Sequence, residues 1–183
     1  AIDAAGCSNT TSTLLAGPPD ITFTVNATNA TCFANCNGAL SANVAGGVPG
    51  YSLNWSNGPS GTPNASLCAG VYTLTITDFN GCVKTTTAAV SSPSPIVVTS
   101  TPGITSCANS CDGTATVVAT GGTLPYTYAF NTVPPISNGS GTINALCASG
   151  YLANVTDANG CTQSTPFTVN MPVALSAAIT GTQ

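Results

Sequence analysis

The chain has 183 residues, of which 43% are hydrophobic, so it can bury a core, but only 3% of its residues are charged, far below an average soluble domain. It contains a single cation, Lys84, five acidic residues and no His. This composition excludes His-based catalysis and His-ligated metal sites, and one cation cannot neutralise the phosphates of a nucleic acid. We therefore expect no enzyme activity, no cofactor and no nucleic-acid partner. Because no apolar run approaches the ~18 residues of a membrane span, we also expect no membrane insertion.

Alternating apolar and polar residues predict short β-strands in chain order. The first runs lie at 21–25, 40–44 and 51–55, and "YTLTIT" at 72–77 has one apolar and one hydroxylated face. A matching run follows at 126–130, whereas no segment carries helical periodicity. We expect about six or seven short strands in each repeat described below, which is typical of a β-sandwich.

The sequence contains two copies of one module. A shift of 75 residues aligns "CFANCNG" with "CANSCDG" and "GGVPGY" with "GGTLPY", and after an insertion of four residues "LCAGVY" aligns with "LCASGY" and "TDFNGC" with "TDANGC". The N-terminal "IDAAGC" matches the end of a copy, and the last residues match the start of one. We expect the end of a preceding repeat at 1–19, a first copy at 20–94, a second copy at 95–172 and the first strand of a following repeat at 173–183.

Proline-rich segments separate the copies. They read "AGPPD", "SSPSP" and "NMP", and proline in such positions gives short, stiff joints that block sheet extension. We therefore expect an all-β chain of tandem immunoglobulin-like sandwiches, bonded by disulfides and arranged as an extended rod. Its partners are then neighbouring repeats of the same chain, with self-association into filaments.

The "TDFNGC" and "TDANGC" stretches predict tight turns. Asp accepts backbone hydrogen bonds, and Gly adopts positive φ easily. A calcium site is the alternative, but one Asp and one Asn per loop fall short of the about 6 to 8 oxygens that calcium takes, so we favour the turn. Just upstream, "LCAGVY" and "LCASGY" resemble a tyrosine corner. We expect Trp55, Tyr72, Phe130 and Tyr151 in the two cores.

Nine cysteines indicate an oxidising compartment, since the chain has no Cys-x-x-Cys pair and no His to complete a metal site. Each copy has four cysteines, which allow three internal connectivities. In an immunoglobulin-like order, the loops before the second strand and before the tyrosine strand lie at the same end of the sandwich. This predicts two disulfides, Cys36–Cys68 and Cys111–Cys147.

The pairing of the other five cysteines stays open. Cys32 and Cys82 can bond within the copy or can bridge neighbouring copies. A third choice follows the constant spacing of 25 residues from Cys7 to Cys32 and from Cys82 to Cys107. Intra-repeat and inter-repeat bonds thus remain alternatives for Cys7, Cys32, Cys82, Cys107 and Cys161.

The outward strand faces should be rich in Thr, Ser and Asn. Such a surface is hydrated without being charged, and it suits contact with polysaccharides or neutral solid surfaces. A merely solvated strand face is the plainer interpretation of any single Thr row, because Thr favours strands.

Taken together, these motifs resemble the SprB-type repeat of large cell-surface adhesins of gliding bacteria in the Bacteroidetes group. Phe130 departs from the pattern because it stands where the first copy has Trp55, and residues 131–145 form an enlarged loop. The resemblance implies an extracellular cell-surface fibre, exported by type IX secretion, that attaches to a substratum during gliding motility. We interpret the chain as a segment of such a structural and adhesive fibre. The alternative is a carbohydrate-binding module array on a secreted protein.

Overall fold

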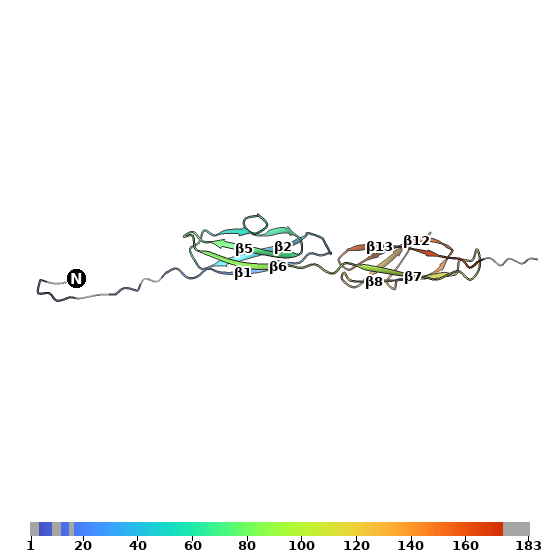
Figure 1. Cartoon of the computed structure of the whole chain (residues 1–183), viewed down its shortest axis with the longest axis horizontal. Helices are drawn as coiled ribbons and strands as arrows, with labels where there is room; N and C mark the ends of the chain where they lie inside the picture. The colour runs from blue at the N-terminus through green and yellow to red at the C-terminus, as the bar shows by residue number, and fades with distance from the viewer. Residues whose placement is uncertain (1–3, 9–11, 15–16, 174–183) are drawn as a thin grey trace, which may run out of the picture. The chain divides into compact units, whose positions relative to one another are not determined.

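The computed structural model describes residues 4–8, 12–14 and 17–173. Its regular elements in these ranges are β-strands (Figure 1). They are β1 (Thr22–Thr28), β2 (Gly38–Ala45), β3 (Ser52–Trp55), β4 (Asn64–Leu67), β5 (Gly70–Thr77), β6 (Val83–Val90), β7 (Val97–Pro102), β8 (Gly113–Thr120), β9 (Thr127–Phe130), β10 (Ile136–Asn138), β11 (Thr142–Leu146), β12 (Ser149–Thr156) and β13 (Thr162–Val169).

The chain divides into two compact units. Unit 1 comprises Ala1–Ala27, Leu40–Asn64 and Val71–Ala88, and unit 2 comprises Thr28–Ala39, Ala65–Gly70 and Ala89–Gln183. Unit 2 therefore contains the second copy together with three stretches of the first copy, 28–39, 65–70 and 89–94.

The strands of the first copy form two three-stranded sheets, in the orders β1-β2-β4 and β3-β5-β6. Apolar and polar residues alternate along β5, so one face of the strand packs into the core. On this strand Leu74 and Ile76 are completely buried, whereas Thr73 is exposed. Trp55 at the end of β3 lies opposite Leu74 in an antiparallel register, and it is 4% exposed. The first, second and fifth strands of an immunoglobulin sandwich share one sheet in the same way, and its third, sixth and seventh share the other.

The strands of the second copy repeat this arrangement with one addition. The sheets have the orders β11-β8-β7 and β10-β9-β12-β13. In β8, "GTATVVAT", every second residue is buried, which places Ala115, Val117 and Ala119 in the core. The strand order confirms the all-β, immunoglobulin-like fold expected from the alternation.

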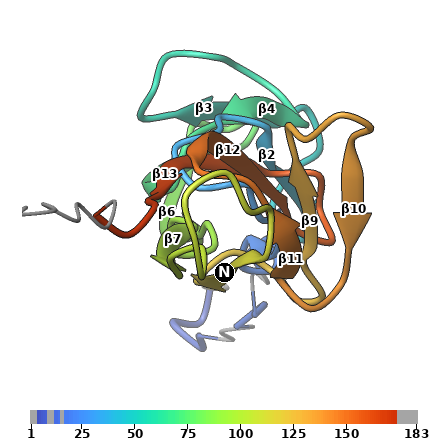
Figure 2. The ribbon, with the colours of Figure 1, turned by 90° about the vertical axis from the view of Figure 1, so that its right-hand side faces the viewer.

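The extra strand β10 lies at the edge of its sheet, beside β9 (Figure 2). It pairs antiparallel with β9, with Ile136 opposite Phe130. Residues 131–145, expected from the sequence as an enlarged loop, contain β10 and the start of β11, so that expectation is wrong for these strands. A strand of three residues is too short to show alternation, so the pattern could not reveal it.

The core of the second copy is built around aromatic rings. Phe130 is 2% exposed and meets Phe167 edge-on, with ring centroids 6.4 Å apart, and Tyr151 stacks on Phe167 at 5.5 Å. Tyr151 is half-buried, as is Tyr72 in the first copy. The Tyr151 hydroxyl donates to the carbonyl oxygen of Cys147 at 3.0 Å, so the second copy has a tyrosine corner.

Each Gly-Gly pair forms a tight turn that is closed by a tyrosine. Gly46 and Gly121 have φ of +71° and +77°, a region that side chains disfavour. The hydroxyl of Tyr51 donates to the carbonyl of Gly46, and that of Tyr126 donates to the carbonyl of Gly121. A Cβ atom at Gly121 would also collide with the backbone carbonyl of Pro95. The turn therefore requires glycine for two reasons.

We predict that Gly121→Ala lowers the free energy of unfolding by about 1–3 kcal/mol, because it combines a strained φ with a backbone collision. Gly139→Ala is the matched control, since Gly139 has open space around its Cβ position. Urea denaturation of both variants, followed by circular dichroism with the disulfides intact, measures the difference. Equal stabilities of the two variants would contradict the prediction.

Candidate functional site: the Asp turns, the cysteine loops and the groove of unit 2

The Asp157 carboxylate organises the turn that carries Cys161. Its Oδ2 accepts a hydrogen bond from the backbone N–H of Thr123 at 2.9 Å, and its Oδ1 accepts from the N–H groups of Asn159 and Cys161 at 2.9 and 2.8 Å. Burial raises the pKa of Asp157, but these backbone hydrogen bonds outweigh it and hold the pKa below its usual value. The charged carboxylate thus fixes the backbone of Cys161.

Asp78 makes the same turn in the first copy. Its Oδ2 accepts from the N–H of Val48 at 2.9 Å, and its Oδ1 accepts from the N–H of Cys82 at 2.8 Å. The hydrogen bond from Val48 is the main cause that lowers the pKa of Asp78. In both copies the oxygens of the carboxylate are occupied by backbone donors, which is the turn that the sequence predicts. The calcium alternative has no support in this geometry, and the described residues contain no group of three or more His, Cys, Asp or Glu that could hold a metal.

The loop that carries Cys32 is held by local polar contacts. The N–H of Thr31 donates to Asn37 Oδ1 at 3.0 Å, and Asn37 Nδ2 donates to the Thr31 hydroxyl at 2.7 Å. The N–H of Asn35 donates to the Cys32 carbonyl at 3.2 Å, and Ala34 between them has φ of +57°. The loop therefore presents Cys32 in a defined turn.

The second copy contains the same loop around Cys107. The N–H of Ser106 donates to Asp112 Oδ1 at 3.0 Å, and the N–H of Ser110 donates to the Cys107 carbonyl at 3.2 Å. Asn109 has φ of +66°. Hydrogen bonds from Ser106 and Ser110 lower the pKa of Asp112 to about 2. An ionised carboxylate thus takes the place of the Asn37 amide.

The structure contains three disulfides in its described residues. Two of them, Cys36–Cys68 and Cys111–Cys147, have the pairing that the immunoglobulin-like order predicts within each copy. The third is Cys32–Cys161, with an S–S distance of 2.05 Å and a Cα–Cα distance of 5.7 Å. It joins a cysteine of the first copy to one of the second, which is the bridging alternative that the sequence left open.

Two exposed cysteines, Cys82 and Cys107, are not in disulfides. They occupy the positions that correspond to Cys161 and Cys32 in the other copy. Cys7 is also exposed.

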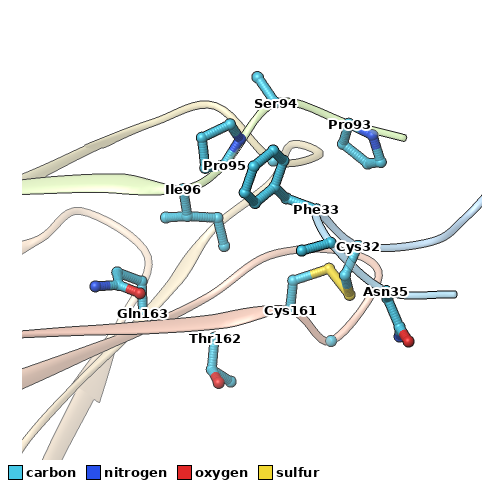
Figure 3. Close-up of a pocket in the computed structure, with 13 residues that line it drawn as sticks. Cys32, Phe33, Asn35, Pro93, Ser94, Pro95, Ile96, Cys161, Thr162 and Gln163 are labelled. Atoms are coloured by element: carbon cyan, nitrogen blue, oxygen red, sulfur yellow. A yellow bond between two sulfur atoms is a disulfide. The ribbon is translucent and has the colours of Figure 1, made fainter. Parts of the chain in front are cut away.

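A groove of about 480 Å³ lies beside the Cys32–Cys161 disulfide, and every residue that lines it belongs to unit 2. We call it the Phe33 groove. Phe33 is 56% exposed, and Figure 3 shows its ring directed toward Pro95. The lining residues are Cys32, Phe33, Ala34, Asn35, Pro93, Ser94, Pro95, Ile96, Gly122, Gly160, Cys161, Thr162 and Gln163.

The Phe33 groove has no group suited to acid–base chemistry. Its two cysteines are oxidised, and its other polar side chains are the amides and hydroxyls of Asn35, Ser94, Thr162 and Gln163. An aromatic face beside neutral hydrogen-bonding groups can bind a ligand but cannot move a proton near neutral pH. The sequence did not predict this groove, and its only signal there is an aromatic residue, Phe33, inside the Cys-x-x-x-Cys loop.

The strand order and the internal duplication define the class of protein: tandem immunoglobulin-like sandwich repeats bonded by disulfides. The family model of the SprB repeat matches residues 24–60 and 99–134, one segment in each copy. Both copies therefore match the SprB repeat over part of their length, as the motif resemblance implied.

Comparison with curated proteins finds no match. Among solved structures, the chain is similar to DIP-gamma IG1+IG2, with 14% identity and a TM-score of 0.45, covering 85% of this chain and 99% of that one. It is also similar to the N-terminal eight Ig domains of Down Syndrome Cell Adhesion Molecule isoform 1.30.30, with 13% identity and a TM-score of 0.40, covering 85% of this chain and 25% of that one. The amphioxus IgVJ-C2 molecule has 13% identity and a TM-score of 0.33, covering 68% and 91%. In the ranges that the structure describes, no helix has the length and hydropathy needed to cross a membrane.

We predict that Asp157→Asn lowers the free energy of unfolding at neutral pH and flattens its dependence on pH. The pKa of Asp157 lies below its usual 3.8 in the folded chain, so its contribution is present above that value and is lost as the pH falls through the folded pKa. Urea denaturation at a series of pH values between about 7 and 2 checks this.

Asp20→Asn is the control for this series, because it changes an exposed carboxylate. Its pH profile should follow that of the unsubstituted chain. A steep acid loss of stability in Asp157→Asn, equal to that of the control, would refute the role of this carboxylate.

Proposed function

We propose that this chain is a segment of an extracellular structural and adhesive fibre at a cell surface, built of tandem repeats, which mediates attachment to a surface or gliding. The repeats that we propose are 20–94 and 95–172, in an extended rod, with the end of a preceding repeat at 1–19 and the first strand of a following repeat at 173–183. The match of both copies to the SprB repeat supports this proposal.

The single observation that carries the proposal is the Cys32–Cys161 disulfide. Disulfides persist in oxidising compartments, which favours an extracellular place for the chain. This bond joins the two copies covalently, beyond the link that the peptide chain already provides. A covalent bond between copies serves a structural fibre, whereas it adds nothing to a catalytic site.

The exposed faces of the strands carry hydroxyl groups and few charges, which supports attachment to uncharged surfaces. Thr85 and Thr87 on β6, and Thr162 and Ser164 on β13, are exposed, and Lys84 is the only Lys or Arg in the chain. Such faces offer hydroxyl donors and acceptors to neutral surfaces. Their contacts depend little on ionic screening, in contrast to contacts made by charged side chains.

We predict that microspheres coated with the disulfide-intact chain attach to glass and to cellulose under flow, and that attachment changes by less than about twofold between 0.05 and 1 M salt. Microspheres coated with albumin provide the background. Counting retained spheres by microscopy gives the result. Attachment at the albumin level would overturn the adhesive function, and a steep loss in high salt would refute its uncharged mechanism.

A second candidate function is binding of neutral polysaccharide, and the Phe33 groove is the observation that favours it. An exposed aromatic ring next to amide and hydroxyl groups provides an apolar face and hydrogen-bond partners, which are the two features that a sugar ring requires. This function would place the chain among carbohydrate-binding module arrays.

We predict that, if the groove binds polysaccharide, Phe33→Ala weakens the binding by about fivefold or more, because the loss of one well-placed aromatic contact costs about 1 kcal/mol or more. Phe79→Ala is the matched control, since Phe79 is 75% exposed and does not line the groove. Glycan arrays and isothermal titration calorimetry measure both variants. An equal loss in both variants, or no saturable binding by the unsubstituted chain, would exclude this second function.

A further inference from the structure

Cys82 and Cys107 stand in two turns whose backbone hydrogen bonds match those in the turns of the bonded pair Cys161 and Cys32. In the Asp turns, the N–H of the cysteine donates to the Asp Oδ1 at 2.8 Å for both Cys82 and Cys161. The Asp N–H donates back to the carbonyl of Cys82 at 3.0 Å, and to that of Cys161 at 2.9 Å. The unbonded turn therefore has the same form as the bonded one.

The glycine beneath each Asp turn supports this match. Gly47 and Gly122 both have φ of +57°, and each lies against the Asp carboxylate and an Ile side chain. These contacts are to Asp78 and Ile21 in the first case, and to Asp157 and Ile96 in the second. Since Ile96 and Gly122 line the Phe33 groove, the face around Cys82 is built on the same packing as the face that receives Cys32 (Figure 3).

The cysteine loops match as well. The carbonyl oxygens of Cys32 and Cys107 each accept a hydrogen bond at 3.2 Å from the N–H of the residue three positions later. In both loops the residue just before that donor has a positive φ. One loop is bonded to Cys161 and the other is not, yet both have the same backbone form. The loop around Cys107 is thus preorganised for a partner of the Cys161 type.

We propose that Cys107 and Cys82 are half-sites for further inter-repeat disulfides of the Cys32–Cys161 type, so that when two molecules of this chain meet from head to tail, Cys107 of one forms a disulfide with Cys82 of the other. The bond repeats the Cys32–Cys161 pair, whose two half-sites lie within unit 2. Asn159 Nδ2 donates to the Thr31 carbonyl at 3.1 Å beside that pair. Asn80 holds the corresponding position beside Cys82 and would donate to the carbonyl of Ser106 of the other molecule.

The bond forms by thiol–disulfide exchange with a small-molecule disulfide such as oxidised glutathione. The Cys107 thiolate attacks oxidised glutathione, which forms a mixed disulfide and releases one glutathione. The Cys82 thiolate of the second molecule then attacks the Cys107 sulfur and releases the second glutathione. Two protein thiols lose two protons and two electrons in total, and oxidised glutathione takes up both as two glutathione thiols.

The test uses two complementary variants, Cys82→Ser and Cys107→Ser, in the whole chain with Cys7→Ser in both, so that each carries one half-site. They are given different mass labels, mixed in equal amounts in a glutathione redox buffer, quenched with acid and separated on a non-reducing gel. Heterodimers should exceed the sum of homodimers by about tenfold or more, because docking brings two cysteines together only in the heterodimer, whereas in a docked homodimer a serine faces the remaining cysteine. Adding Asn80→Ala to the variant that keeps Cys82 should slow heterodimer formation.

Random oxidation predicts a different result, in which heterodimers make up only half of the dimers. That result, or the absence of dimers, overturns the proposal. Peptide mapping of the unsubstituted chain gives an independent readout: it should find Cys82 linked to Cys107 in dimers and longer species, and a Cys82–Cys107 bond confined to monomers would also overturn the proposal. Retention of Cys36–Cys68 and Cys111–Cys147 in each variant shows that it has folded. The inference rests on the repeat architecture of the proposed fibre and not on adhesion, so failure of the microsphere test leaves it standing.

Discussion

The hydrogen bonds from backbone N–H groups to the carboxylates of Asp78 and Asp157 are the constraint on which the cysteine geometry depends. In a chain with almost no charged residues, these two buried acids are placed where backbone donors stabilise them. Each carboxylate ties the last turn of a copy to the Gly-Gly turn, and it sets the backbone of the cysteine that follows. Without this constraint, Cys161 would not be presented in a fixed position to Cys32.

A surface with very few charged residues can form few ion pairs, and disulfides supply stability instead. Cys36–Cys68 and Cys111–Cys147 each close a loop inside one copy, whereas Cys32–Cys161 connects the two copies. Such bonds suit small sandwiches, because a domain of this size buries a limited fraction of its surface. The Phe33 groove is a by-product of the same bond, since the loop that delivers Cys32 also delivers an exposed aromatic ring.

Local pattern predicted most of the fold, and it failed where the outcome depended on distant parts of the chain. The alternation of Leu74 and Ile76 with Thr is a local feature of the sequence, so the strands could be predicted from it. The pairing of Cys32 with Cys161 spans 129 residues and depends on how two loops meet in space, which no spacing rule encodes. The sequence did not predict β10, because a strand of three residues is too short to show alternation. It did not predict the Phe33 groove, because the sequence around a loop aromatic residue does not show which distant residues pack opposite it.

The long separation of Cys32 and Cys161 has a mechanical consequence. When the two ends of the chain are pulled apart, tension passes from residue 32 through the sulfur atoms to residue 161, and the residues between them bear none of it. At about 3.3–3.6 Å per residue, roughly 430–460 Å of polypeptide is withheld from extension as long as the bond is intact. Reduction of this bond would place the residues between Cys32 and Cys161 under tension, apart from the stretches that Cys36–Cys68 and Cys111–Cys147 still close, so the redox state of the three bonds sets how far the chain can stretch.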